Sequence, residues 1–172
     1  MNATPQGLSI RPYRAGDALV TLRIFTVAIT ETAAADYSSE QVEAWAQPGQ
    51  IEVESWHHAM HRRNSFVAAV HGEVVGFSDV DRDGYIDMMF VDPQHQRQGV
   101  ARALLAEAER QAGELCAAQL TADVSITARP FFESQGFFVD HLQEFVQRGV
   151  RFVNFRMRKL LHEQRDLGAP AS

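Results

Sequence analysis

The pattern of apolar and polar positions divides the N-terminal third of the chain into one strand and three helices. Residues 8–11 alternate as a short strand does, and residues 17–32 repeat apolar side chains at the three- and four-residue spacing of a helix. Two further helices are predicted over residues 39–46 and 54–62. The first of these two follows a Ser-x-x-Gln capping box that begins at Ser38, which fixes its start.

From residue 65 the repeat changes from the helical spacing to the alternation of β-strands. Residues 65–70 and 74–80 are predicted to form two strands joined by a tight turn at His71 and Gly72, and residues 85–91 a third strand. Because the connections between these strands are short, we expect them to follow one another as a meander.

The C-terminal half alternates helices and strands. A helix begins after Gly99, and its apolar face is formed by Ala101, Leu104, Leu105, Ala108, Ala112 and Leu115. A strand over residues 119–124, a helix over residues 127–135 and a hairpin with arms at residues 137–146 and 150–159 complete the pattern. This order predicts an α/β (α+β) domain with a mixed central sheet of about seven strands flanked by helices, which differs from a doubly wound nucleotide-binding fold.

Length and composition indicate one globular domain. The chain has 172 residues, of which 45% are hydrophobic and 22% charged, which is ordinary for a protein with one sizeable core. We expect the domain to span residues 1–161. Residues 162–172 lose the periodicity and end in small side chains, so we expect this tail to be frayed.

Charge and cysteine content exclude several classes of function. The net charge of −6 argues against a general nucleic-acid-binding protein, and the lone Cys116 excludes an intrachain disulfide. The N-terminus lacks the basic-then-apolar pattern of a secretion signal, and no apolar run approaches the roughly 18 residues of a membrane span. A cytoplasmic protein without a membrane or nucleic-acid partner is therefore expected.

The loop before the helix at residue 100 carries the strongest chemical signal, in the segment VDPQHQRQGVARALL. Main-chain N–H groups at a helix start point outward without partners, and the helix dipole favours an anion there. The segment lacks the glycines and lysine of the common nucleotide loops. It fits the pattern [Q/R]-x-x-G-x-[G/A] with Gln96, Gly99 and Ala101, where two small residues allow a pyrophosphate to approach the main chain. Arg97 adds a positive charge at the rim.

At these positions the chain resembles the GNAT (GCN5-related N-acetyltransferase) superfamily, in which this loop holds the pyrophosphate of acetyl-CoA. The resemblance covers nearly all of residues 8–161. It rests on five segments in the family order: SIRPYRAGD, FVAAVHGEVVGFSDV, YIDMMFVDPQHQRQGVARALLAEAE, ITARPFFESQGF and FRMRKLL. It implies a GNAT fold, and transfer of an acetyl group from acetyl-CoA to an amine by direct attack in a ternary complex, with no metal.

The resemblance also implies which residues hold the cofactor. The pyrophosphate is expected at the loop and helix start, formed by Gln96, Arg97, Gln98, Gly99, Val100 and Ala101. A bulge in the preceding strand, expected around Met89, Phe90 and Val91, would turn main-chain N–H groups towards the thioester and the pantetheine. Ser125 stands where the family often has an asparagine that binds pantetheine, and Phe132 is expected to wall the pantetheine tunnel.

Asp87 is the candidate general base. Alternation places Tyr85, Asp87 and Met89 on one face, so this carboxylate lies beside the cofactor-facing end of the strand. An acceptor ammonium with a pKa of about 10.4 must lose a proton before it can attack. The alternatives are that Asp87 is an ordinary polar residue on an open sheet face or that it binds the substrate cation. Asp79 and Asp81 are weaker candidates for the base.

The position of the usual general acid departs from the family pattern. Many members have a tyrosine near the CoA sulfur where this chain has Phe132. Either the hydroxyl of Ser125 or Tyr85 serves instead, or the thiolate, with a thiol pKa of about 8.5, leaves without assistance. The missing tyrosine also favours an alternative function, a non-catalytic CoA-binding sensor of the same fold. A third hypothesis keeps the fold and changes the acyl group or transfers it to oxygen.

The remaining motifs are interpreted as structural. His57 and His61 share a helix face, but no third ligand is recognisable, so a solvated helix is preferred to a metal site. Trp45 is assigned to the core, whereas Trp56 is left open between the core and the acceptor site. Basic residues of the C-terminal hairpin are assigned to a solvated sheet face, with a homodimer edge as the alternative. The acceptor, which residues 25–60 would select, is not identified by any motif.

Overall fold

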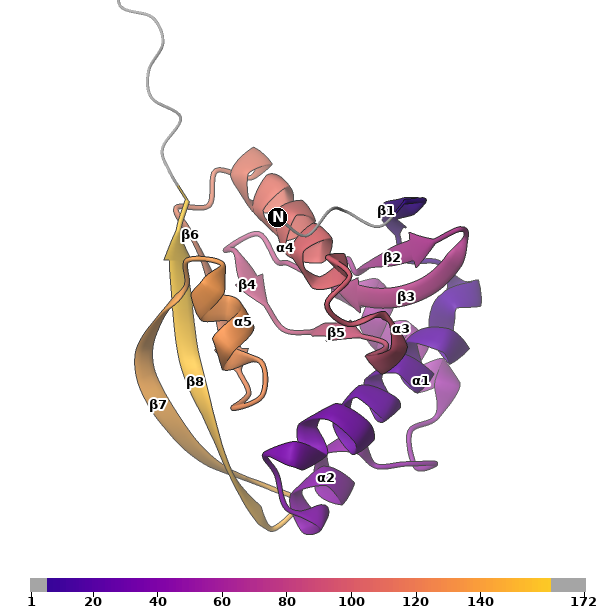
Figure 1. Ribbon diagram of the computed structural model, residues 1–172, viewed down its shortest axis with the longest axis vertical. Coiled ribbons are helices and arrows are strands. Elements are labelled where there is room, and N and C mark those ends of the chain that lie inside the picture. The colour runs from indigo at the N-terminus through magenta and orange to yellow at the C-terminus, as the bar shows by residue number, and fades with distance from the viewer. Residues whose placement is uncertain (1–5, 162–172) are drawn as a thin grey trace, which may run out of the picture.

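The computed structural model describes residues 6–161, which form two four-stranded sheets (Figure 1). The first sheet is antiparallel, with the order β1 (Leu8–Pro12), β2 (Phe66–Val70), β3 (Glu73–Ser78) and β5 (Met89–Val91). The second has the order β4 (Tyr85–Ile86), β6 (Gln119–Val124), β8 (Val150–Leu160) and β7 (Phe138–Gln147). In the second sheet β4 pairs with β6 in parallel and the other pairs are antiparallel.

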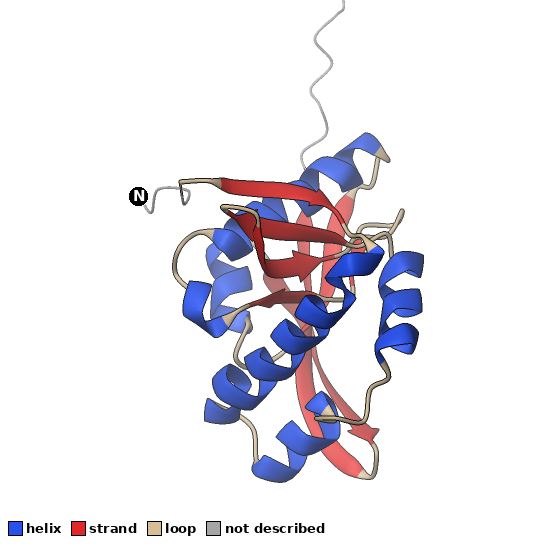
Figure 2. Cartoon of the chain, turned by 90° about the vertical axis from the view of Figure 1, so that its right-hand side faces the viewer, coloured by secondary structure: helices blue, strands red, loops and turns tan. Residues whose placement is uncertain are grey.

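Helices cover both faces of the first sheet (Figure 2). Residues 6–161 contain five α-helices: α1 (Ala18–Val27), α2 (Ser39–Ala46), α3 (Val53–Arg62), α4 (Val100–Glu114) and α5 (Arg129–Ser134). Of these, α4 lies on one face of the first sheet and α1 and α3 lie on the other. The helical path of α1 continues through a π-helical turn, Ala28–Thr32, and a 3-10 turn, Ala33–Ala35. α2 starts at the capping box predicted from the sequence, in which Ser38 Oγ accepts the N–H of Gln41 at 3.2 Å.

The alternation of the central strands separates two hydrophobic clusters. Phe66 and Val75 point to one face of the first sheet and pack with Leu104 and Leu105 of α4. Side chains of the opposite face pack with α1 and α3 in a cluster that includes Val67, Phe77, Ile24, Trp56 and Met60. The first sheet is therefore held between α4 and the N-terminal helices, so the start of α4 is rigidly placed relative to β5.

The sequence predicted this architecture with one difference in the strand count. The predicted fold class is confirmed, and most predicted elements agree with the structure within two residues. The described residues form eight strands because the segment predicted as one strand, residues 85–91, divides into β4 and β5, which belong to different sheets. The predicted tail, residues 162–172, lies outside the described residues.

One helical segment passes the length and composition test for a membrane span. The continuous helical run Ala15–Ala35 has 21 residues and includes an 18-residue stretch with a mean hydropathy of 1.4, a candidate span that was not expected from the sequence. Its apolar side chains Ile24 and Ile29 are fully buried, and Thr21 Oγ1 accepts the indole N–H of Trp56 at 3.0 Å. These contacts are those of a core helix, which makes the segment weak support for a membrane span.

Candidate functional site

The segment from residue 84 to residue 92 moves from one sheet to the other in its middle. At its start, the carbonyl oxygen of Gly84 accepts the N–H of Thr121, and Ile86 pairs with Ala122 of β6. At its end, the N–H of Asp92 donates to the carbonyl oxygen of Val75 of β3. The two strands β4 and β5 therefore diverge (Figure 1), and residues of both β5 and β6 line an opening between the two sheets.

The change of partner takes place at Asp87 and Met88. Both of their N–H groups donate to Asp79 Oδ1, at 2.8 and 3.2 Å. The carbonyl oxygen of Met88 also faces β3, where it accepts the N–H of Asp79 at 3.2 Å and the hydroxyl of Ser78 at 2.8 Å. Two consecutive residues thus face the same neighbour, which is the arrangement of a β-bulge.

The bulge decides which main-chain groups face the opening. Successive residues of a strand direct their N–H and C=O groups to opposite sides. Because Met88 and Asp92 face β3, Met89 and Val91 direct theirs away from β3, towards the opening. The sequence placed the bulge around residues 89–91, but it lies at residues 87–88, because Asp79 offers its acceptor to these two N–H groups.

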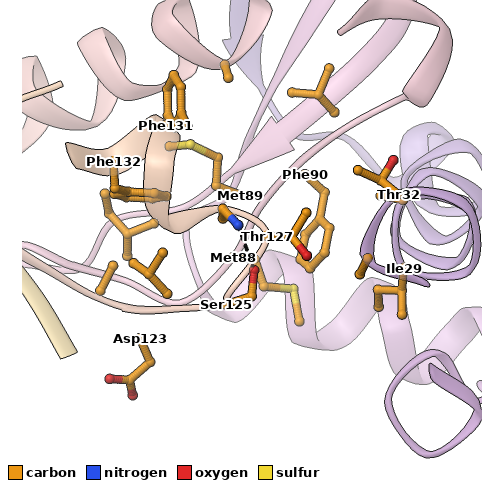
Figure 3. A pocket seen from close by; sticks show the side chains of 18 of the residues that line it. Ile29, Thr32, Met88, Met89, Phe90, Asp123, Ser125, Thr127, Phe131 and Phe132 are labelled. Atoms are coloured by element: carbon orange, nitrogen blue, oxygen red, sulfur yellow. Dashed lines mark hydrogen bonds between the residues drawn. The ribbon is translucent and has the colours of Figure 1, made fainter. Parts of the chain in front are cut away.

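The opening between β5 and β6 contains a cavity of about 850 Å³. It is lined by eleven of the twelve residues singled out from the sequence: Asp87, Met89, Phe90, Val91, Gln96, Arg97, Gly99, Val100, Ala101, Ser125 and Phe132. Figure 3 shows Met89, Ser125 and Phe132 around it. The remaining residue, Gln98, does not line the cavity, because its side-chain amide donates to the carbonyl oxygen of Gln94 at 3.1 Å.

The loop before α4 is held by a buried carboxylate. Asp92 Oδ1 accepts the N–H of Gln94, and Asp92 Oδ2 pairs with the guanidinium of Arg23 at 2.7 Å. Burial opposes ionisation, but the Gln94 N–H and Arg23 outweigh it and lower the pKa of Asp92. Gln96 is fixed separately, because its side-chain amide donates to Thr32 Oγ1 at 2.8 Å. The loop is therefore tied to the helical run of α1.

Gly99 turns the chain into α4. Its φ is +87°, the left-handed region that glycine adopts without strain. The first intrahelical bond runs from the N–H of Ala103 to the carbonyl oxygen of Gly99. The N–H groups of residues 100–102 precede it, so they point out of the helix start, beside the cavity. This corner of the cavity can accept an anion.

Asp87 lies at the rim of the cavity in an ion pair. Its Oδ2 is 2.5 Å from Nε of Arg63, and its side chain is 41% exposed. Arg63 also lies 3.9 Å from Oδ2 of Asp79, whose side chain is 3% exposed. The guanidinium therefore lies between an accessible carboxylate and a buried one.

Burial raises the pKa of Asp79 to about 7, against the opposing effect of the two N–H groups that it accepts; the negative charge of Asp87 raises it further. Asp79 Oδ2 is buried and has no hydrogen-bond partner among the described residues. The protonated form is compatible with this site, because Oδ1 can accept both N–H groups while Oδ2 carries the proton.

Replacing Asp79 with asparagine is expected to stabilise the protein in a pH-dependent way. The folded-state pKa is above the unfolded value, so the folded protein binds the proton more tightly and wild-type stability falls as the pH rises from about 4 to about 7. The asparagine side chain does not titrate. We expect the difference in unfolding free energy between Asp79→Asn and wild type to widen by roughly 2–3 kcal/mol between pH 5 and pH 8, measured by urea unfolding. A difference that stays constant with pH would contradict the raised pKa.

Comparison with known proteins assigns the fold to a family. Residues 33–159 match the model of the acetyltransferase (GNAT) domain. The chain belongs to the GNAT family. It is 41% identical over 152 residues to the uncharacterized N-acetyltransferase YafP of Escherichia coli K12, covering 88% of this chain and 95% of that protein.

Solved GNAT structures superpose on the chain. A GCN5-related N-acetyltransferase from Rhodopseudomonas palustris has a TM-score of 0.86 at 32% identity, covering 94% of this chain and 98% of that chain. YncA from Salmonella typhimurium, solved with acetyl-CoA, has a TM-score of 0.69 at 19% identity, covering 95% and 99%. PaiA from Thermoplasma acidophilum, solved with coenzyme A, has a TM-score of 0.72 at 18% identity, covering 89% and 98%. The last two comparisons show a shared fold.

The GNAT chain has no hydroxyl at the position of Phe132. This side chain is buried and packs edge-on against the rings of Phe131 and Phe137, at 5.5 and 5.0 Å between ring centres. Of the two alternative hydroxyls, Tyr85 donates to Asp123 Oδ2 at 3.2 Å, and burial followed by the charge of Asp123 raises its pKa to about 12. Proton transfer from Tyr85 to a thiolate is therefore unfavourable.

Ser125 is the more available hydroxyl in the cavity wall. Its Oγ accepts the N–H of Ala128 at 3.1 Å, and its own proton has no acceptor within residues 6–161 (Figure 3). Of the weaker base candidates, Asp81 lies outside the cavity lining and accepts the N–H groups of Asp83 and Tyr85 at a turn.

The cavity wall also contains residues that were not singled out from the sequence as site residues, among them Asp123, Asn154 and Tyr37. Asp123 and Asn154 line the cavity from β6 and β8 and are joined through the side chain of Gln143. The hydroxyl of Tyr37 accepts the N–H of Ile126 and donates to the carbonyl oxygen of Val153. Alternation along β6 marks Asp123 as opposite to Leu120 and Ala122, but the cavity on its side depends on distant segments.

The remaining sequence motifs have structural partners. His57 bonds to the hydroxyl of Tyr13 at 3.1 Å, and no cluster of three metal-ligating side chains occurs within residues 6–161. Trp56 is buried in the core, whereas Trp45 lines the cavity and packs edge-on against Tyr37. The assignment of Trp45 to the core alone is therefore incomplete.

Proposed function

We propose that this GNAT protein is an N-acetyltransferase that transfers the acetyl group of acetyl-CoA to an amine by direct attack. The observation that carries the proposal is one cavity that contains both an anion-accepting helix start at Gly99 and the free main-chain edge of β5. The acetyl-CoA and coenzyme A of the structures with the same fold support it. A cytoplasmic location and a homodimer remain predictions from the sequence.

The residues of the cavity fit the two ends of acetyl-CoA. The N–H groups at the start of α4 would bind the pyrophosphate, and the side chain of Arg97 would add a positive charge. The N–H groups of Met89 and Val91 face the opening and would bind the pantetheine and the thioester carbonyl. Phe132 and Ser125 line the side of the cavity formed by α5 and the end of β6. The cavity thus has hydrogen-bond donors where the cofactor is polar and apolar walls elsewhere.

The chemistry requires three steps from the residues of this site. As the amine attacks, negative charge grows on the thioester oxygen, and a main-chain N–H of β5 stabilises it. Before this attack the ammonium form of the acceptor must lose a proton, and we assign its removal to the carboxylate oxygen of Asp87 that is not bonded to Arg63. The C–S bond then breaks and the thiolate leaves. Ser125 can donate a hydrogen bond to the sulfur, since no acceptor for its proton lies in the described part of the chain.

Calorimetry and a turnover assay together test this function. Acetyl-CoA is titrated into the protein, and thiol release is measured with a panel of amines that includes polyamines, aromatic amines and peptides with free N-termini. We expect micromolar binding and thiol release that depends on one class of amine. Tight binding without turnover on any amine would support the sensor function, for which the absence of a tyrosine at position 132 is the specific observation. A panel of acyl-CoA thioesters against the same amines tests whether another acyl group is preferred.

Removal of the carboxylate of Asp87 is expected to slow the reaction without weakening cofactor binding. We expect Asp87→Asn to lower kcat by about 100-fold and to remove the acid limb of the pH–rate profile, because an amide cannot accept the proton. The dissociation constant of CoA, measured by calorimetry, is expected to stay within about twofold of wild type. Asp83→Asn is the matched control, since Asp83 is an exposed acid in the turn before β4. An unchanged profile in Asp87→Asn would exclude Asp87 as the base.

A further inference from the structure

Asp79 is a buried acid that the proposed chemistry does not use. Its side chain is 3% exposed and it does not line the cavity, so it cannot reach the acceptor or the cofactor. Its contacts are nevertheless concentrated at one place. Oδ1 accepts the two N–H groups of the bulge, and its own N–H donates to the carbonyl oxygen of Met88.

The N–H groups that Asp79 binds, those of Asp87 and Met88, lie directly after Ile86, where the hydrogen-bonded pairing between β4 and β6 ends. Gly84 directs its main-chain carbonyl to β6, and Ile86 pairs with Ala122. By alternation Met88 is the next residue that would bond to β6. Its N–H instead donates to Asp79, and its carbonyl oxygen accepts from β3. A hydrogen bond from Met88 to β6 would extend the parallel pairing of β4 and β6 by one step into the opening between β5 and β6.

We propose that Asp79 is a positioning residue that keeps the cofactor opening apart by holding the N–H groups of Asp87 and Met88 away from β6. Without this acceptor, two main-chain donors that now make part-buried hydrogen bonds would lose their partner, and β6 offers the nearest alternative ladder. Closing that ladder would rotate residues 89 and 91 away from the orientation that presents their N–H groups to the opening. Asp79 would therefore set the affinity for the cofactor without touching it.

Arg63 extends the same arrangement to the rim of the cavity. Its guanidinium lies 2.5 Å from Asp87 Oδ2 and 3.9 Å from Asp79 Oδ2. The main chain of Asp87 is thus held by Asp79 and its side chain by Arg63. Both groups of Asp87 are fixed from outside the cavity, which orients its second carboxylate oxygen.

The decisive experiment compares two substitutions of Asp79 with a matched control. Asp79→Ala removes the acceptor, whereas Asp79→Asn keeps a carbonyl oxygen in its place. Asp17→Ala is the control, because Asp17 is also buried, also accepts a main-chain N–H, from Arg14, and also pairs with an arginine, but it lies outside the cavity lining. The readouts are the dissociation constant of CoA by calorimetry and the hydrogen exchange of the amides of Asp87 and Met88 by NMR.

We expect Asp79→Ala to weaken CoA binding by at least about tenfold and to expose the two amides to exchange, because a displacement of about 1 Å at a binding edge has effects of this size or larger. Asp79→Asn is expected to restore both properties to near wild type. Asp17→Ala is expected to lose stability but to bind CoA like wild type. Equal CoA binding in the two alanine variants would overturn the proposal, and so would an asparagine variant that binds as weakly as Asp79→Ala.

The steady-state parameters add a test that rests on the proposed function. In Asp79→Ala the KM for acetyl-CoA is expected to rise by at least about tenfold, whereas the KM for the amine changes little. If wild type turns over no amine, the proposed function fails, but CoA binding and hydrogen exchange still decide the role of Asp79. If Asp79→Ala does not fold, the role of Asp79 is judged from the hydrogen exchange of the amides of Asp87 and Met88 in wild type and Asp79→Asn. Slow exchange in both proteins would support the proposal, and rapid exchange in wild type would overturn it.

Discussion

Gly99→Val is expected to reduce the affinity for CoA by about 100-fold or more, which corresponds to about 2.8 kcal/mol of binding free energy. Two effects combine at this position. The φ of +87° is unfavourable for a β-branched residue, so the turn into α4 would change its conformation. A branched side chain would also stand where the cofactor must approach the main chain. Calorimetric titration of CoA is the measurement.

Gly149→Val separates the two effects. Gly149 has a φ of +78° in the turn between β7 and β8, and a side chain there would meet open space. This variant introduces comparable backbone strain far from the loop that precedes α4, so it should lose stability but keep the affinity for CoA. Wild-type affinity in a folded Gly99→Val protein would contradict the assignment of the pyrophosphate to the start of α4.

Gly84→Ala is expected to produce a large loss of stability. A Cβ at this position would lie 2.1 Å from the main-chain carbonyl oxygen of Gln119, which belongs to β6 and cannot move as a side chain could. The φ of +83° adds strain. Because Gly84 also accepts the N–H of Thr121, displacement would disrupt the start of the β4–β6 pairing. We expect the free energy of unfolding to fall by roughly 3–5 kcal/mol, measured by urea denaturation.

The control for this variant is Gly49→Ala. Gly49 has a similar φ of +73°, but a Cβ there would have no neighbour within 4 Å. Its loss of stability should be limited to the conformational term, about 1 kcal/mol. Equal losses in the two variants would show that strain alone, and not the contact with β6, determines the effect at Gly84.

The sequence predicted those features that depend on neighbouring residues. The capping box at Ser38, the turn at Gly99 and the hairpin around Gly149 each depend on a few consecutive positions, and each is present in the structure. The loop motif and the downstream aromatic motif also predicted the family, because they occur in a fixed order along the chain.

Features that depend on distant segments were not predictable in the same way. Residues 85–91 have the composition of one strand, and nothing in them shows that their partner changes at Met88. The change of partner depends on Asp79. The alternation of apolar and polar residues in the preceding strand predicts only that position 79 is polar. The ion pair between Arg63 and Asp87 likewise joins the end of α3 to the bulge, 24 positions apart. Non-local hydrogen bonds of this kind are fixed by the register between strands, which the sequence pattern specifies only approximately.

The bonds of Tyr37 and Gln41 have a consequence for how new substrate specificity could arise in this chain. Tyr37 donates to the carbonyl oxygen of Val153, and the side-chain amide of Gln41 donates to that of Arg151, so the N-terminal helices are attached to the C-terminal hairpin by two bonds to main-chain atoms. The part of the cavity wall that contains Tyr37 and Val153 is therefore formed jointly by two segments more than 100 positions apart. Exchange of residues 25–60 for those of a relative would replace only one of the two segments that form this wall of the cavity. Inherited changes in one segment should therefore be accompanied by changes in the other.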